Sequence, residues 1–91
     1  MKRYHVFVEG RVQGVGMRGF CMMEAQTYGL SGTVKNLEDG SVEIYVQGAE
    51  ELIDIFLTKI KAGNRFIRVD NISIKEVPVV EGEKHFSYGG Y

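Results

Sequence analysis

Residues 42–62 read VEIYVQGAEELIDIFLTKIKA, and the spacing of their apolar residues changes at Gly48. Up to residue 47 every second residue is Val or Ile, which is the pattern of a strand with one buried face. From residue 49 to residue 62 the apolar residues recur every three or four positions, with glutamates in the first turn and lysines in the last. This spacing and charge pattern predict an amphipathic helix. The stretch therefore predicts a strand followed directly by a helix.

The residues before this strand predict a hairpin, and the first 30 residues predict a strand, a loop and a helix. Residues 38–41 carry Asp39-Gly40 at their centre, which is typical of a tight turn, and residues 32–37 form the other strand of the hairpin. Residues 4–9 alternate as a strand, and residues 10–16 hold three glycines and are expected to form a loop. Residues 17–28 predict a helix whose buried face is formed by Met17, Cys21, Ala25 and Tyr28.

After the second helix the chain is expected to be irregular over residues 64–70, to form a strand over residues 71–77 and to add a short strand over residues 85–88. The order is β-α-β-β-α-β plus a short fifth strand. This order predicts an α+β, ferredoxin-like split-βαβ sandwich, with two helices on one face of an antiparallel or mixed sheet. At 91 residues, without a linker or repeat, we expect one domain over residues 1–91.

Charge and composition exclude several functions. Eleven Lys and Arg against twelve Asp and Glu give a net charge of −1, and the aromatic motifs of RNA-binding sheets are missing, so no nucleic-acid partner is expected. The apolar runs are far shorter than the ~20 residues of a membrane span. A single cysteine, Cys21, suits a reducing cytoplasm. A polar surface and one core suggest a monomer.

The glycine-rich loop joins the end of a strand to the start of a helix, where unpaired backbone N–H groups favour an anion. Arg18, in the first helical turn, can add a guanidinium to phosphate or carboxylate oxygens. The alternative is that the glycines only make a tight turn and that Arg18 is solvated. Residues 14–19 also match the dinucleotide pattern G-x-G-x-x-G, but the acidic residues that follow it lie in the hairpin turn, so we reject that interpretation.

At this loop the chain resembles the acylphosphatase family, and the resemblance runs over essentially its whole length. The first motif, residues 8–18, reads VEGRVQGVGMR and is long and specific. The second motif lies in the hairpin, as residues 32–36 (GTVKN) followed by Gly40, Val42 and Gly48, and the family-like end is FSY at residues 86–88. Two positions depart from the family pattern: Met17, where Phe is commoner, and Thr33, where an aromatic residue is usual.

The resemblance implies hydrolysis of the carboxyl–phosphate bond of an acyl phosphate to a carboxylate and inorganic phosphate, with neither metal nor cofactor. Arg18 matches the family's catalytic arginine, which binds the phosphate, and Asn36 matches its catalytic asparagine, which orients the attacking water. The family's phosphate cradle matches the backbone amides of Gln13, Gly14, Val15, Gly16, Met17 and Arg18.

These implied roles agree with the chemistry of the side chains. Phosphoryl transfer needs positioning and charge neutralisation, and an amide can both accept a hydrogen bond from a water and donate one to it. We read Cys21 as a core residue and expect a phosphate oxygen of the substrate to take the proton of the water. The alternative is an acylphosphatase-like module that binds phosphate without turnover, although the presence of both Arg18 and Asn36 favours catalysis. An RNA-binding sheet of the same fold is disfavoured by the charge.

Overall fold

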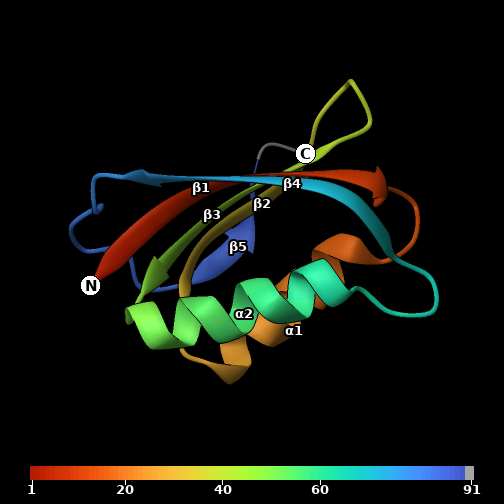
Figure 1. The fold of residues 1–91 in the computed structure, drawn as a ribbon. Helices are drawn as coiled ribbons and strands as arrows, with labels where there is room; N and C mark the ends of the chain where they lie inside the picture. Colours follow the sequence, from red (N-terminus) through yellow and green to blue (C-terminus); the bar gives the residue numbers. More distant parts are fainter. Residues whose placement is uncertain (90–91) are drawn as a thin grey trace.

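The computed structural model describes residues 1–89 and contains a five-stranded sheet with two helices packed against one face (Figure 1). Residues 90 and 91 of the expected domain lie outside the described residues. The elements are, in chain order, β1 (Lys2–Arg11), α1 (Met17–Thr27), β2 (Ser31–Asn36), β3 (Val42–Gly48), α2 (Glu50–Ala62), β4 (Arg68–Val77) and β5 (Phe86–Tyr88). This order confirms the predicted α+β fold class.

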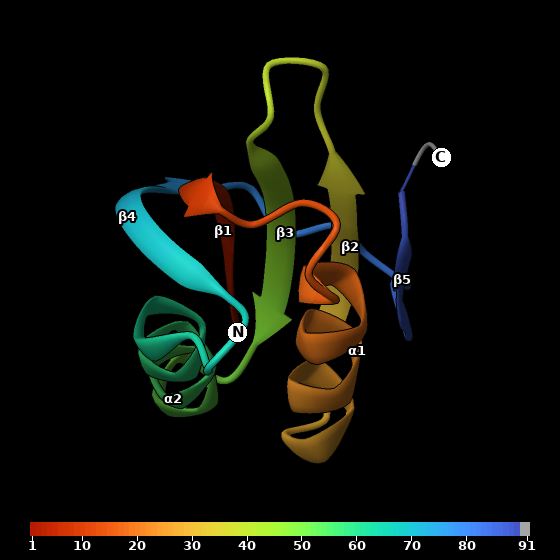
Figure 2. The ribbon, with the colours of Figure 1, turned by 90° about the vertical axis from the view of Figure 1, so that its right-hand side faces the viewer.

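The strand order is β4-β1-β3-β2-β5, so the first strand of the chain lies inside the sheet. The β1–β3, β1–β4 and β2–β3 pairs are antiparallel, whereas β2 and β5 are parallel, and the sheet is therefore mixed. Figure 2 shows α1 beneath the β2 side of the sheet and α2 beneath the β4 side. Among the described residues no helix combines the length and the apolar character needed to cross a bilayer.

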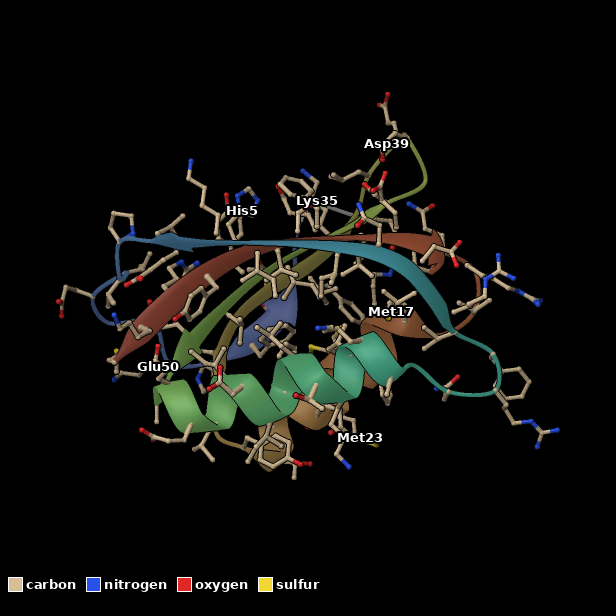
Figure 3. All side chains as sticks on the ribbon, viewed as in Figure 1. His5, Met17, Met23, Lys35, Asp39 and Glu50 are labelled. Atoms are coloured by element: carbon tan, nitrogen blue, oxygen red, sulfur yellow. The ribbon has the colours of Figure 1, made fainter. Side chains whose placement is uncertain are left out.

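The hydrophobic core lies between the sheet and the helices. Every second residue of β3 is buried there, and α2 contributes Ile53, Phe56 and Ile60, as the change of spacing at Gly48 predicts. On α1 the predicted face is buried at Met17, Cys21 and Ala25, and the half-buried Tyr28, the residue that follows the helix, packs at the edge of the core. In Figure 3 Met17 points into this layer, whereas His5 and Lys35 rise from the opposite face of the sheet.

Two predictions were wrong: that a loop begins at residue 10, and that the irregular segment after the second helix lasts until residue 70. β1 continues to Arg11 and β4 begins at Arg68, and the two extensions pair with each other. A bulge between Glu9 and Gly10 allows this pairing to continue. Gly10 has a φ of 136°, and a Cβ at this position would lie 2.3 Å from the carbonyl oxygen of Arg68, so no other residue fits. The other boundaries agree with the prediction or differ from it by at most two residues.

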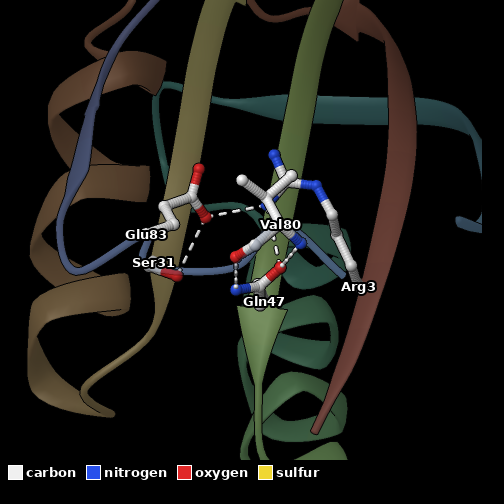
Figure 4. A network of polar contacts seen from close by, with 5 residues as sticks. All are labelled: Arg3, Ser31, Gln47, Val80 and Glu83. Atoms are coloured by element: carbon white, nitrogen blue, oxygen red, sulfur yellow. Dashed lines mark hydrogen bonds and ion pairs between the residues drawn. The ribbon is translucent and has the colours of Figure 1, made fainter. Parts of the chain in front are cut away.

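A buried polar network holds the segment that connects the two edge strands, residues 78–85, across the end of the sheet (Figure 4). Gln47 donates from Nε2 to the Val80 carbonyl (3.0 Å), and the Val80 N–H donates to Gln47 Oε1 (2.8 Å). Arg3 donates from Nη1 to Glu83 Oε1 (2.7 Å), which also accepts from the Ser31 hydroxyl (2.9 Å). The network ties this segment to β1, β2 and β3, and β5 begins directly after it.

Candidate active site

The loop of residues 12–16 connects β1 to α1 and alternates in backbone handedness. Gly14 and Gly16 have φ values of 72° and 82°, and the non-glycine residues around them have negative φ. Such alternation makes successive N–H groups converge on one point, which is the geometry of an anion-binding nest. Within the described residues, the N–H groups of residues 13–17 donate no hydrogen bond. The first turn of α1 carries neither a side-chain cap nor an acidic residue, so the positive end of its dipole is not neutralised by the helix itself.

A cavity of about 270 Å³ opens at this loop and contains both predicted catalytic side chains. Arg18 reaches it from α1 and Asn36 from the last position of β2. Its lining consists of Val12, Gly14, Gly16, Met17, Arg18, Gly19, Asn36 and Tyr88. The structure thus brings together residues that are 18 positions apart in the sequence, because α1 returns the chain antiparallel to β1 and delivers it into β2.

Two of the predicted cradle residues, Gln13 and Val15, do not line the cavity. The Gln13 side chain instead donates from Nε2 to the carbonyl oxygens of Leu37 (2.7 Å) and Ser41 (2.8 Å) at the base of the hairpin. Val15 is half-buried and packs against the core. Their side chains therefore fix the loop to its surroundings, and the bonds of Gln13 tie the loop to the residues next to Asn36.

The side-chain oxygen of Asn36 is buried and has no hydrogen-bond partner among the described residues. A buried carbonyl oxygen without a partner is costly and rare, and such an atom is commonly matched by a water or a ligand. Asn36 pairs with Val42 across the hairpin, which fixes the backbone that carries the amide. The Asn36 side chain thus lines the cavity, while its Oδ1 is buried without a partner among the described residues.

Sequence reasoning missed three lining residues: Val12, Gly19 and Tyr88. The guanidinium carbon of Arg18 lies 5.2 Å from the centre of the Tyr88 ring, over its face. Tyr88 reaches the cavity because β5 pairs with β2, where Tyr88 lies opposite Val34. Position 88 lies in the family-like FSY segment, but no local pattern connects it with Arg18, 70 residues earlier, and the contact follows from the sheet topology.

Other reactive side chains lie outside the cavity. Cys21 is fully buried in the core, and burial raises the pKa of its thiol to about 12. His5 packs on the open face of the sheet, where its Nε2 lies 2.9 Å from Glu43 Oε2. Thr33, which departs from the family pattern, does not line the cavity, whereas Met17 does. Within residues 1–89 no three His, Cys, Asp or Glu side chains cluster as metal ligands would.

Comparison with known proteins relates this chain to one family. The acylphosphatase family model matches residues 4–88. A curated acylphosphatase of Clostridium acetobutylicum is 49% identical over 86 residues, covering 94% of each chain, and one of Geobacillus thermodenitrificans is 49% identical over 92 residues, covering 99% of this chain and 98% of the relative. The crystal structure of acylphosphatase from Bacillus subtilis matches with a TM-score of 0.91 and 44% identity over 97% of this chain and 98% of that one.

Proposed function

The chain belongs to the acylphosphatase family and hydrolyses acyl phosphates, and we propose that Arg18, Asn36 and the amides of the β1–α1 loop carry out this reaction. The observation that supports the assignment is that the side chains of Arg18 and Asn36 line one cavity. The products are a carboxylate and inorganic phosphate. The cavity supplies the two things that this hydrolysis needs, a place for the phosphoryl group and a side-chain amide that can hold a water.

The phosphoryl group binds at the loop. The N–H groups of residues 13–17, the N-terminus of α1 and the guanidinium of Arg18 all favour negative charge at this point. Backbone donors that are already aimed at an anion need no rearrangement when charge develops on the phosphoryl oxygens. We infer that they stabilise the loose, highly charged transition state of phosphoryl transfer, and that no metal ion is required for this.

The attacking water binds at Asn36. Its side-chain amide holds the water oxygen in line with the bond to the leaving carboxylate. The new bond joins the water oxygen to phosphorus, and the bond between phosphorus and the carboxyl oxygen breaks. The proton of the water passes to a phosphoryl oxygen, because no His, Cys, Asp or Glu of the described residues lines the cavity to act as a base. The leaving group takes the electron pair as a carboxylate.

We further propose that the enzyme acts as a monomer in the cytoplasm. The large apolar side chains that are exposed lie on separate elements, such as Met23 on α1, Ile55 on α2 and Ile74 on β4, and a buried free thiol fits a reducing compartment. Light scattering of the purified protein tests the monomer: the proposal expects the mass of one chain, and a dimer would contradict it.

The roles of Arg18 and Asn36 are tested by hydrolysis of benzoyl phosphate in excess EDTA, with Arg18→Ala and Asn36→Ala. We expect each substitution to lower kcat/KM by about 10²- to 10³-fold, the usual effect of removing one positioned donor or acceptor. Asn36→Ala should still bind inorganic phosphate, whereas Arg18→Ala should bind it more weakly. The matched controls are Arg65→Ala and Asn71→Ala, because both residues are exposed and lie outside the cavity.

Full activity in Arg18→Ala or Asn36→Ala would refute the assigned role of that residue. Loss of activity of the parent in EDTA would refute the metal-free reaction. If a folded parent bound phosphate but released no product from several acyl phosphates, the alternative of a binding module without turnover would be the better description. Circular dichroism of each variant separates lost chemistry from lost folding.

A further inference from the structure

The ring of Tyr88 forms part of the cavity wall and lies against the arginine that binds phosphate in the proposed function. The guanidinium carbon of Arg18 stands 5.2 Å from the ring centre, within the range of a favourable cation–π contact. Tyr88 is 57% exposed and lies at the end of β5, so one side of the ring faces the cavity region and the rest faces solvent.

Backbone pairing holds Tyr88 in place. Its partner in the parallel β2–β5 pair is Val34, a fully buried core residue, and the N–H of Gly89 donates to the Val34 carbonyl at 2.8 Å. Asn36 lies two positions further along β2, so Tyr88 and Asn36 are carried by two strands that are bonded to each other. The segment that leads into β5 is tied to the sheet by the network around Arg3 and Glu83 (Figure 4). The backbone that carries the Tyr88 ring is therefore fixed by pairing to the strand that carries Asn36.

An arginine that lies over an aromatic ring keeps its hydrogen-bond donors. The five N–H groups of a guanidinium lie in its plane and point outward from its edges, while the ring contacts a face. The contact with Tyr88 therefore restricts the orientation of the Arg18 side chain without consuming the donors that bind phosphate. Restricting a side chain in its bound orientation lowers the entropy lost on binding.

We propose that Tyr88 is a positioning residue: its ring holds the Arg18 guanidinium in the orientation that binds the phosphoryl group, and so sets the affinity for phosphate. The proposal rests on the function proposed for Arg18. If the contact strengthens the binding of the substrate and of the transition state equally, removing the Tyr88 ring raises KM and leaves kcat unchanged. The proposal also makes the effect independent of the acyl group, because the contact is made to Arg18 and not to the leaving carboxylate.

The test compares Tyr88→Leu and Tyr88→Phe with the parent, using benzoyl phosphate, acetyl phosphate and inorganic phosphate. Tyr88→Leu should raise the KM of both substrates, and the Kd of inorganic phosphate from an NMR titration, by about two- to fivefold, the range of an exposed cation–π contact. Tyr88→Phe keeps the ring and should restore the affinity. The matched control is Phe66→Leu, because Phe66 is 59% exposed, carries Arg65 at 5.3 Å and lies outside the cavity.

Three results would overturn the proposal: unchanged KM and Kd in Tyr88→Leu, a change with benzoyl phosphate only, or the same loss in Tyr88→Phe as in Tyr88→Leu. A change with benzoyl phosphate alone would make Tyr88 a contact for the acyl group instead. A parallel titration of Arg18→Ala with inorganic phosphate distinguishes a failure of the role proposed for Arg18 from a failure of the role proposed for Tyr88. If Arg18→Ala binds phosphate as well as the parent, the proposed function of Arg18 fails. If Arg18→Ala binds it weakly and Tyr88→Leu does not, only the role of Tyr88 fails.

Discussion

Replacing Glu83 by alanine should destabilise the protein far more than replacing an ordinary surface glutamate. Glu83 forms an ion pair with Arg3 at 2.7 Å, and the two side chains are only 18% and 8% exposed. Its carboxylate also accepts the hydroxyl of Ser31. In Glu83→Ala the guanidinium of Arg3 stays buried without its carboxylate, and Ser31 loses its acceptor.

The size of the effect follows from the burial of this pair. Removing one partner of a buried ion pair costs about 3–5 kcal/mol, because the remaining charge is left in a poorly solvated place. Since Glu83 keeps some exposure, we expect the lower end, about 3 kcal/mol, or about 15 °C in Tm for a chain of this length. The double variant Arg3→Met/Glu83→Leu removes both charges and should recover most of this loss, because an apolar pair of similar size replaces an ion pair at little cost.

The assay is urea unfolding followed by circular dichroism. The matched control is Glu76→Ala, which breaks the exposed Lys2–Glu76 pair at 3.1 Å, whose side chains are 41% and 54% exposed. That pair should contribute little to stability, because solvent screens an exposed ion pair. The reasoning is refuted if Glu83→Ala costs no more than Glu76→Ala, or if the double variant loses the sum of its single substitutions.

Two further predictions concern the core and the sheet. Cys21 should not react with Ellman's reagent at pH 8 in the native protein and should react fully in urea, because burial raises its thiol pKa to about 12; rapid native labelling would show that the core opens. Gly32→Ala should lower the free energy of unfolding in urea by more than about 3 kcal/mol, because φ is 140° and the added Cβ would lie 1.8 Å from the Tyr45 carbonyl oxygen. Gly40→Ala has open space around the added Cβ and should lower it by about 1 kcal/mol. Equal losses in the two variants would contradict the steric explanation.

Local patterns in the sequence predict most of the fold, because each helix and strand carries its own spacing of apolar residues. The change at Gly48 from alternate positions to every third or fourth position is an example, and the structure confirms it. The bulge at Gly10 could not be predicted in this way, because the need for glycine arises from the Arg68 carbonyl on another strand. The same distant contact explains why Gly10 and Arg11 belong to β1 and not to the predicted loop.

The candidate site, too, could be predicted only in part from the sequence. The placement of Arg18 and Asn36 in one cavity could be expected from the family motifs in which they stand, whereas the local pattern around Asn36 alone would favour a turn residue. The contact of Tyr88 with Arg18 could not, because it depends on a parallel pair between strands more than 50 residues apart. The polar network around Arg3 could not be predicted from the sequence either. An arginine on a strand is expected to face solvent, whereas Arg3 is only 7% exposed.

The position of β1 inside the sheet has a consequence for how the chain folds. Arg3 pairs with Val77 on one side and with Gln47 on the other, so β1 completes its pairing only when segments far along the chain have joined it. Closing such long loops costs entropy before the contacts compensate for it, which slows folding to the millisecond-to-second range typical of nonlocal topologies. Until then both edges of β1 are open to other chains, and dilute conditions during refolding should favour the native pairing over association.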